Sequence, residues 1–116
     1  MTERRRFLRF DTALSAICDF VTDRKKSKYE VKNISKEGAL LLLDKKLPEG
    51  EEIKLTMDVP VDNVPIFASC QVAWQKEMKK DTAYETGVRF TEIDNSNRGR
   101  LLEYIYTQWL KQLDNI

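Results

Sequence analysis

The chain has 116 residues, of which 41% are hydrophobic and 34% are charged, and its formal net charge is +1. This length supports one hydrophobic core, and this balance is typical of a folded globular domain rather than a disordered one. The chain has no histidine, the commonest general base and a common metal ligand. Its two cysteines, Cys18 and Cys70, are far apart without CxxC spacing, so we expect buried thiols rather than a disulfide or a metal site.

Six segments are predicted to be strands, because their apolar residues alternate with polar ones or form a short apolar run. They are residues 13–21, 29–31, 39–43, 52–59, 66–75 and 84–90. In the fifth segment the period of two places Trp74 on the apolar face that begins at Ile66. In the sixth segment Gly87 interrupts the opposite face, where a bulge or a close backbone approach is expected.

The period changes near the C-terminus, which predicts a helix from about Asn95 to Leu113 with Asp94 or Ser96 as its N-cap. One apolar stripe of this helix, expected to pack, consists of Leu101, Leu102, Ile105, Tyr106, Trp109, Leu110 and Leu113. Six short antiparallel strands and an amphipathic helix predict a mainly β fold, a closed or nearly closed barrel with the helix over an open end or side.

The expected organisation is one domain, with an Arg-rich flexible arm over residues 1–12, a barrel over 13–92 and a helix over 94–114. No apolar run approaches the roughly 18 residues that span a bilayer, and the arm lacks the apolar segment of a secretory signal. We therefore expect a cytoplasmic location without membrane insertion. The oligomeric state stays open, because the apolar helix could cover its own barrel or that of a second copy.

The first candidate site is the arm, where four arginines oppose Glu3 alone among residues 1–10. They are Arg4, Arg5, Arg6 and Arg9. A guanidinium is always charged, and its planar fork of donors matches phosphate oxygens in pairs, so this segment suits an anionic ligand. Taken alone, it could also be a frayed basic terminus or a weak electrostatic patch.

The second candidate site is the turn from Asn33 to Gly38. Asn and Ser side chains form hydrogen bonds readily in turns, and a glycine allows a positive φ or the close approach of another group. Arg5-x-x-x-Arg9, followed about two dozen residues later by Asn33-x-Ser35-x-x-Gly38, resembles the paired RxxxR and [D/N]xSxxG signature of the PilZ family.

Later segments extend this resemblance over nearly the whole chain. Val72-Ala73-Trp74 is similar to the family's Val-x-Trp strand, and Thr86-Gly87-Val88-Arg89-Phe90 is similar to its Gly-Val-x-Phe strand. The resemblance implies a six-stranded antiparallel β-barrel, the PilZ-like split barrel, followed by a C-terminal helix. It also implies a receptor for the bacterial second messenger cyclic di-GMP rather than an enzyme.

Carried over to this sequence, Arg5 and Arg9 would contact the phosphates and guanine faces. Asn33, Ser35 and Gly38 would line the surface that holds a guanine edge, where the Asn carbonyl can accept from guanine N1 and N2.

In the family, an arginine directly before RxxxR accompanies a stacked ligand dimer. Arg4 occupies that position here, so two ligands per domain are expected, with Arg6 adding positive charge. Trp74 is interpreted as a core residue, with ligand contact as the alternative.

The alternative function is a small β-barrel that binds single-stranded nucleic acid. Basic residues outside the arm are interspersed with acids and the total charge is nearly neutral, which disfavours this alternative. Catalysis is disfavoured too, because acids such as Glu52 and Asp58 occupy alternating, solvent-facing positions. We expect the arm to fold over the barrel when ligand binds and to signal to a downstream protein that the sequence does not identify.

Overall fold

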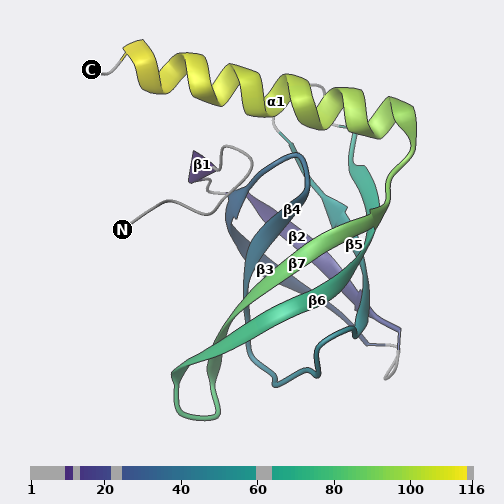
Figure 1. The fold of residues 1–116 in the computed structure, drawn as a ribbon, viewed down its shortest axis with the longest axis vertical. Helices are drawn as coiled ribbons and strands as arrows, with labels where there is room; N and C mark the ends of the chain where they lie inside the picture. Colours follow the sequence, from purple (N-terminus) through teal and green to yellow (C-terminus); the bar gives the residue numbers. More distant parts are fainter. Residues whose placement is uncertain (1–9, 12–13, 22–24, 60–63, 115–116) are drawn as a thin grey trace.

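The structure is a computed structural model that describes residues 10–11, 14–21, 25–59 and 64–114. Seven strands and one helix lie in this part of the chain (Figure 1). The strands are β1 (Phe10–Asp11), β2 (Ser15–Phe20), β3 (Lys25–Ile34), β4 (Gly38–Leu43), β5 (Glu52–Met57), β6 (Ile66–Lys79) and β7 (Ala83–Glu92). The helix is α1 (Asn95–Asp114), which crosses one end of the barrel (Figure 1).

All strand pairs are antiparallel, in the order β1-β3-β2-β5-β6-β7-β4, and an additional β3–β4 pairing closes the sheet. β3 makes this closure possible because residues 25–30 pair with β2 and residues 30–34 pair with β4. The predicted six-stranded barrel with a C-terminal helix is therefore confirmed in β2–β7 and α1. The short strand β1 is additional: it falls within the segment expected to be an arm, yet Phe10 and Asp11 pair with β3.

The barrel interior is filled by the inward residues that the alternation predicts. On β2 these are Ala16, Cys18 and Phe20, each no more than 1% exposed. Both thiols are free and buried, as expected. Burial raises the pKa of Cys18 to about 12 and also raises that of Cys70. Because only a thiolate is a good nucleophile, neither cysteine is suited to catalysis at neutral pH.

A bulge in β6 corrects the prediction that Trp74 faces the core. Val72 pairs with Val88 and Trp74 pairs with Gly87, so one extra residue of β6, Ala73, lies between these pairs. The extra residue reverses the alternation, as β-bulges do. Trp74 is consequently 48% exposed on the outer surface.

Gln75, the residue after Trp74, takes the inward direction as a result of the same bulge. Its Nε2 donates to Thr86 Oγ1 (3.0 Å) and to the Lys45 carbonyl (2.9 Å), and its Oε1 accepts from the Leu47 amide (2.9 Å). The Gln75 side chain thus connects β7 to the loop after β4 through hydrogen bonds.

The helix begins after Asp94, whose Oδ1 accepts from the Asn97 amide at 2.8 Å. Of the two predicted N-caps, Asp94 and Ser96, the structure therefore has Asp94. The hydrogen bond from the Asn97 amide lowers the pKa of Asp94. Leu101 and Tyr104 are buried against the barrel. The rest of the predicted stripe does not all pack there: Trp109, expected to be a packing residue, is 37% exposed.

Gly38 marks a close approach of two backbones, as the sequence suggested for this position. It begins β4 and pairs with Arg89 of β7. A Cβ at position 38 would overlap the Val88 carbonyl oxygen and lie 3.1 Å from the Val88 carbonyl carbon. Since these are backbone atoms held in the sheet, they cannot move aside as a flexible side chain could. The glycine is therefore needed for space.

We expect Gly38→Ala to lower the free energy of unfolding by about 2 kcal/mol or more, because the new methyl group forces β4 and β7 apart. Urea unfolding followed by tryptophan fluorescence measures this effect. Gly99→Ala is the control: nothing lies within 4 Å of its added Cβ, and alanine in a helix is favoured over glycine by about 0.5–1 kcal/mol. Equal stability of Gly38→Ala and the parent chain would contradict the argument.

Candidate ligand-binding site

The predicted site residues that the structure describes converge on the outer surface of β3, β4, β7 and β6. Asn33 pairs with Leu40, Leu40 pairs with Gly87, and Gly87 pairs with Trp74. Residues directly opposite one another in a sheet share a face, so these four form one row, called here the Asn33–Trp74 row. Its ends are three strand spacings apart, about 14 Å along the curved sheet.

The indole of Trp74 lies over Gly87, which shortens the open part of this row. A Cβ on Gly87 would overlap the indole ring atoms, so only glycine leaves room for the ring. A bulge or a close backbone approach was predicted at Gly87: the bulge lies opposite it in β6, and the group that approaches it is the Trp74 side chain rather than a backbone. The exposed ring thus reaches from β6 onto β7, toward Leu40 and Asn33.

The turn from Ser35 to Gly38 borders the row. Ser35 is 1% exposed, and its Oγ accepts from the Glu37 amide (3.3 Å) and donates to the Gly38 carbonyl (3.4 Å). The Phe90 amide donates to the Glu37 carbonyl at 2.9 Å, which fastens the turn to β7. Ser35 and Gly38 therefore shape this surface, while the half-buried Asn33 lies in it.

β1, which directly follows the arginine segment in the sequence, pairs with β3 beside this turn. Phe10 pairs with Ile34, the residue before Ser35, and Asp11 pairs with Asn33. Arg9 directly precedes Phe10 in the sequence. The other candidate arginines precede it in the same segment, and all four lie outside the described residues: Arg4, Arg5, Arg6 and Arg9. Phe10 and Asp11, which directly follow the first motif half in the sequence, thus pair with Ile34 and Asn33 of the second half.

Arg89 is a candidate that the sequence reasoning did not single out. It pairs with Gly38 and with Gln71, one outward position along from the Asn33–Trp74 row. Its side chain is exposed, and its Nη2 donates to Gln71 Oε1 at 3.1 Å. The signal was present in the alternation of β7, which places residue 89 on the same face as Gly87. A guanidinium at this position adds a phosphate-matching group to the surface.

On the other side of the row, Lys32 Nζ contacts Glu85 Oε2 at 3.1 Å. Lys32 lies at the bulge of β3, between the paired residues Val31 and Asn33. The carboxylate offsets the charge of this lysine, so Arg89 is better placed than Lys32 to attract an anion.

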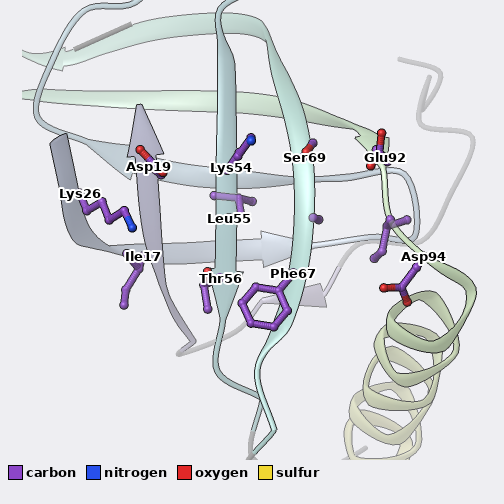
Figure 2. A pocket seen from close by; sticks show the side chains of 12 residues that line it. Ile17, Asp19, Lys26, Lys54, Leu55, Thr56, Phe67, Ser69, Glu92 and Asp94 are labelled. Carbon is purple, nitrogen blue, oxygen red and sulfur yellow. The ribbon is translucent and has the colours of Figure 1, made fainter. Parts of the chain in front are cut away.

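A separate hollow of about 540 Å³ lies on the outer surface of β2, β5 and β6 (Figure 2). Its polar residues form a row across the strands in which Asp19 pairs with Lys54 and Lys54 with Ser69 (Figure 2). Charges of opposite sign alternate there, so the hollow has no concentration of positive charge for a phosphate. None of the predicted site residues that the structure describes lines it.

Other kinds of site find no support in the part of the chain that the structure describes. Those residues include no group of three or more His, Cys, Asp or Glu side chains that could hold a metal ion. Among the same described residues, no helix is both long enough and apolar enough to cross a membrane. The Asn33–Trp74 row instead offers an aromatic face, an amide and a nearby guanidinium, which suits a planar, anionic ligand with hydrogen-bonding edges.

Comparison with known proteins agrees with this fold. The chain is similar to MotI/DgrA of Bacillus subtilis, an inhibitor of motility, with a TM-score of 0.77 and 21% identity over 99% of this chain and 54% of that one. It is similar to the PilZ domain of Escherichia coli YcgR, solved with c-di-GMP, with a TM-score of 0.75 and 15% identity over 97% of both chains. It is also similar to MrkH of K. pneumonia in complex with c-di-GMP, with a TM-score of 0.79 and 16% identity over 99% of this chain and 57% of that one.

The chain thus spans about half the length of MotI/DgrA and MrkH, and nearly all of the YcgR domain. A search among curated proteins gives no match. The family model for the PilZ domain matches residues 3–107, which is most of the sequence and includes both motif halves. The chain therefore belongs to the PilZ domain family.

Proposed function

We propose that this PilZ domain is a receptor for cyclic di-GMP, not an enzyme. The observation that supports the proposal is the register of β1 on β3, because β1 directly follows the arginine segment in the sequence and pairs beside the Asn33–Gly38 turn and the Asn33–Trp74 row. Two similar structures, the YcgR domain and MrkH, were solved with c-di-GMP. The ligand has two phosphates and two guanines, which match guanidinium groups and an amide-lined surface.

Each residue of the site has a chemical task in this proposal. Arg5 and Arg9 hold the phosphates and guanine faces, and Asn33 accepts from a guanine edge through its side-chain oxygen. Ser35 and Gly38 act mainly through shape, because the Ser35 hydroxyl is already bonded within the turn. They keep the surface beside Asn33 open and its backbone in place.

Two further residues complete the site. Trp74 supplies an exposed ring face for a base or a guanidinium, since its indole lies across Gly87 and not in the core. Arg89 supplies positive charge from β7, where it is exposed. Both project from the barrel itself, so they are in place whatever the conformation of the arginine segment.

The arginine count supports binding of two stacked ligands. A stacked pair carries four phosphates, which need more positive charge than Arg5 and Arg9 provide. Arg4 and Arg6 lie in the same segment and can supply it. Arg4 is the residue on which the second ligand depends in this proposal.

Calorimetry with cyclic di-GMP tests the binding site. We expect two ligands per chain, and we expect Arg5→Ala to weaken binding roughly 10-fold to 100-fold, because it removes charge-assisted hydrogen bonds to phosphate. Arg4→Ala should reduce the stoichiometry from two to one. Arg98→Ala, which removes an exposed arginine of α1, is the matched control and should bind like the parent.

Equal affinities of Arg5→Ala and Arg98→Ala would contradict the proposed site. A titration with a single-stranded oligonucleotide at several salt concentrations separates the alternative function. Binding driven by a polyanionic backbone falls steeply as salt rises. If the oligonucleotide bound in this way and displaced cyclic di-GMP, the nucleic-acid function would be favoured.

Trp74 gives a second test, on the barrel side of the site. We expect Trp74→Ala to weaken cyclic di-GMP binding by about 10-fold, since stacking of a base on an aromatic ring contributes about 1–3 kcal/mol. Phe67→Ala is the matched control, because Phe67 is also an exposed aromatic residue, 56% exposed, but borders the hollow on the other surface. If both variants bound equally well, Trp74 would have no part in the site.

Signalling requires that binding change a surface, and β1 offers a route. It pairs with β3 beside the turn and also contacts α1, so it lies between the proposed ligand site and the helix. We infer that ligand orders the segment before β1, and that β1 transmits this change to α1. A downstream protein would then recognise the altered surface.

Amide hydrogen exchange tests this mechanism. Saturating cyclic di-GMP should slow exchange in residues 1–11 at least about tenfold, because the bound arginines hold the segment against the barrel. Amides in the middle of β5, away from the proposed site, provide the internal control. If binding were detected by calorimetry without any change in residues 1–11, the conformational mechanism would be wrong while the receptor function would stand.

A further inference from the structure

Three successive outward positions of β7 present three different kinds of group. Glu85, Gly87 and Arg89 share the outer face of this strand, because alternate residues of a strand point to the same side. The indole of Trp74 lies over Gly87, so the face presents a carboxylate, an aromatic ring and a guanidinium in that order. The first and last of these positions are four residues, or about 14 Å, apart. The ring therefore has a carboxylate on one side and a guanidinium on the other.

This order matches the parts of a nucleotide. Each half of cyclic di-GMP consists of a guanine, a ribose and a phosphate. The phosphate suits the guanidinium of Arg89, and the flat face of the base suits the indole of Trp74. A base that stacks there with its ribose toward Arg89 directs its far edge, which carries the groups used in base pairing, toward Glu85. The carboxylate thus lies where the edge of the base would be read.

Glu85 is paired with a lysine that reaches it from β3. Lys32 Nζ lies 3.1 Å from Glu85 Oε2, and the two side chains are 39% and 20% exposed. Because β4 lies between β3 and β7, these side chains meet over the outer face of β4, next to the Asn33–Trp74 row. The contact occupies one carboxylate oxygen. A carboxylate has about four acceptor positions over its two oxygens, so Glu85 can accept further donors.

The pair places a donor beside an acceptor, which is the complement of guanine. Along its Watson–Crick edge guanine has the acceptor O6, followed by the donors N1–H and N2–H. The ammonium of Lys32 can donate to O6 while the carboxylate of Glu85 accepts from N1 and N2. Adenine has the reverse order on this edge, an amino donor followed by the acceptor N1. It would set that acceptor against the carboxylate, and a polar group left unpaired in this way disfavours the wrong base.

We propose that Glu85 and Lys32 read the Watson–Crick edge of the guanine that stacks on Trp74, and that they make the site specific for guanine over adenine. This inference rests on the proposed receptor function and adds two specificity-determining residues to it. Asn33, at the opposite end of the Asn33–Trp74 row, is left to hold another guanine. The roles of the phosphate-binding arginines are unchanged.

Calorimetry with matched cyclic dinucleotides tests the role of Glu85. The parent chain should bind cyclic di-GMP at least about tenfold more tightly than cyclic di-IMP, which lacks only the N2 amino groups. Glu85→Gln should weaken cyclic di-GMP binding about tenfold, because charge-assisted hydrogen bonds from N1 and N2 are lost. The substitution keeps the size of the side chain.

The direction of the change separates base reading from charge alone. Cyclic di-GMP is a dianion, so removal of a nearby negative charge that made no specific contact would strengthen its binding. The proposal predicts the opposite for Glu85→Gln. The same variant should bind cyclic di-AMP at least as tightly as the parent does, because the carboxylate no longer faces adenine N1. The preference for cyclic di-GMP over cyclic di-AMP should therefore fall at least about tenfold.

Lys32→Met tests the second member of the pair. The variant keeps the length of the side chain and removes its ammonium group. We expect the preference for cyclic di-GMP over cyclic di-AMP to fall several-fold, because O6 loses its donor. The two ligands carry the same charge, so a purely electrostatic role of Lys32 would weaken both equally and would contradict the proposal.

Glu92→Gln is the matched control for Glu85→Gln. Glu92 is an exposed carboxylate of the same strand, but it borders the separate hollow over β2, β5 and β6. We expect it to bind both dinucleotides like the parent. Equal binding of cyclic di-GMP by Glu85→Gln and Glu92→Gln would overturn the specificity proposal and leave the receptor function standing. A parent chain that bound no cyclic di-GMP would overturn both proposals.

Discussion

The close approach of β4 and β7 at Gly38 is the constraint on which the candidate site depends. With no side chain at this position, the first residue of β4 lies against the Val88 carbonyl, and the register that follows pairs Leu40 with Gly87. A shift of one residue would turn the outer side chains of β4 inward. The Glu37 carbonyl, bonded to the Phe90 amide, fixes the same register from the turn. The Asn33–Trp74 row therefore exists because two backbones meet where a Cβ would not fit.

The bulge of β6 determines one side chain on the outer surface and one in the interior. One extra residue turns Trp74 out to lie over Gly87 and turns Gln75 in to bond Thr86 and the loop after β4. Without it, the same alternation would bury the indole and expose the amide. The fully buried Thr86 would then lose the hydrogen bond from Gln75, and an unpaired polar group in a core is costly. The exposed tryptophan and the satisfied core are thus consequences of one local irregularity.

α1 has a defined position on the barrel, because Leu101 and Tyr104 pack on it and Asp94 caps the first turn. The helix also contacts β1, the strand that follows the arginine segment. A helix that packs on the barrel and touches the strand beside the proposed ligand site is suited to relay a small displacement.

The sequence by itself determined the elements and the chemistry of the motifs. Alternation of period two identified five of the barrel strands, a short apolar run identified the one at residues 39–43, and the change of period identified the helix, because side-chain direction follows the backbone repeat. It also singled out Asn33, Ser35 and Gly38, since turn residues have local conformational reasons for their type. The arginine segment was equally visible, although its residues 1–9 lie outside the described part of the chain.

Only the tertiary structure decided which faces those residues share. The sequence predicted a buried Trp74 because a bulge leaves no signature in the alternation before it. It did not separate the buried apolar residues of α1 from the exposed ones, because both recur at helical spacing and only contact with the barrel distinguishes them. The alternation of β7 could place Arg89 on the outer face, but its position beside the Asn33–Trp74 row follows from its pairing with Gly38. In each case the deciding quantity is a distance between strands or layers far apart in the chain, which local periodicity cannot contain.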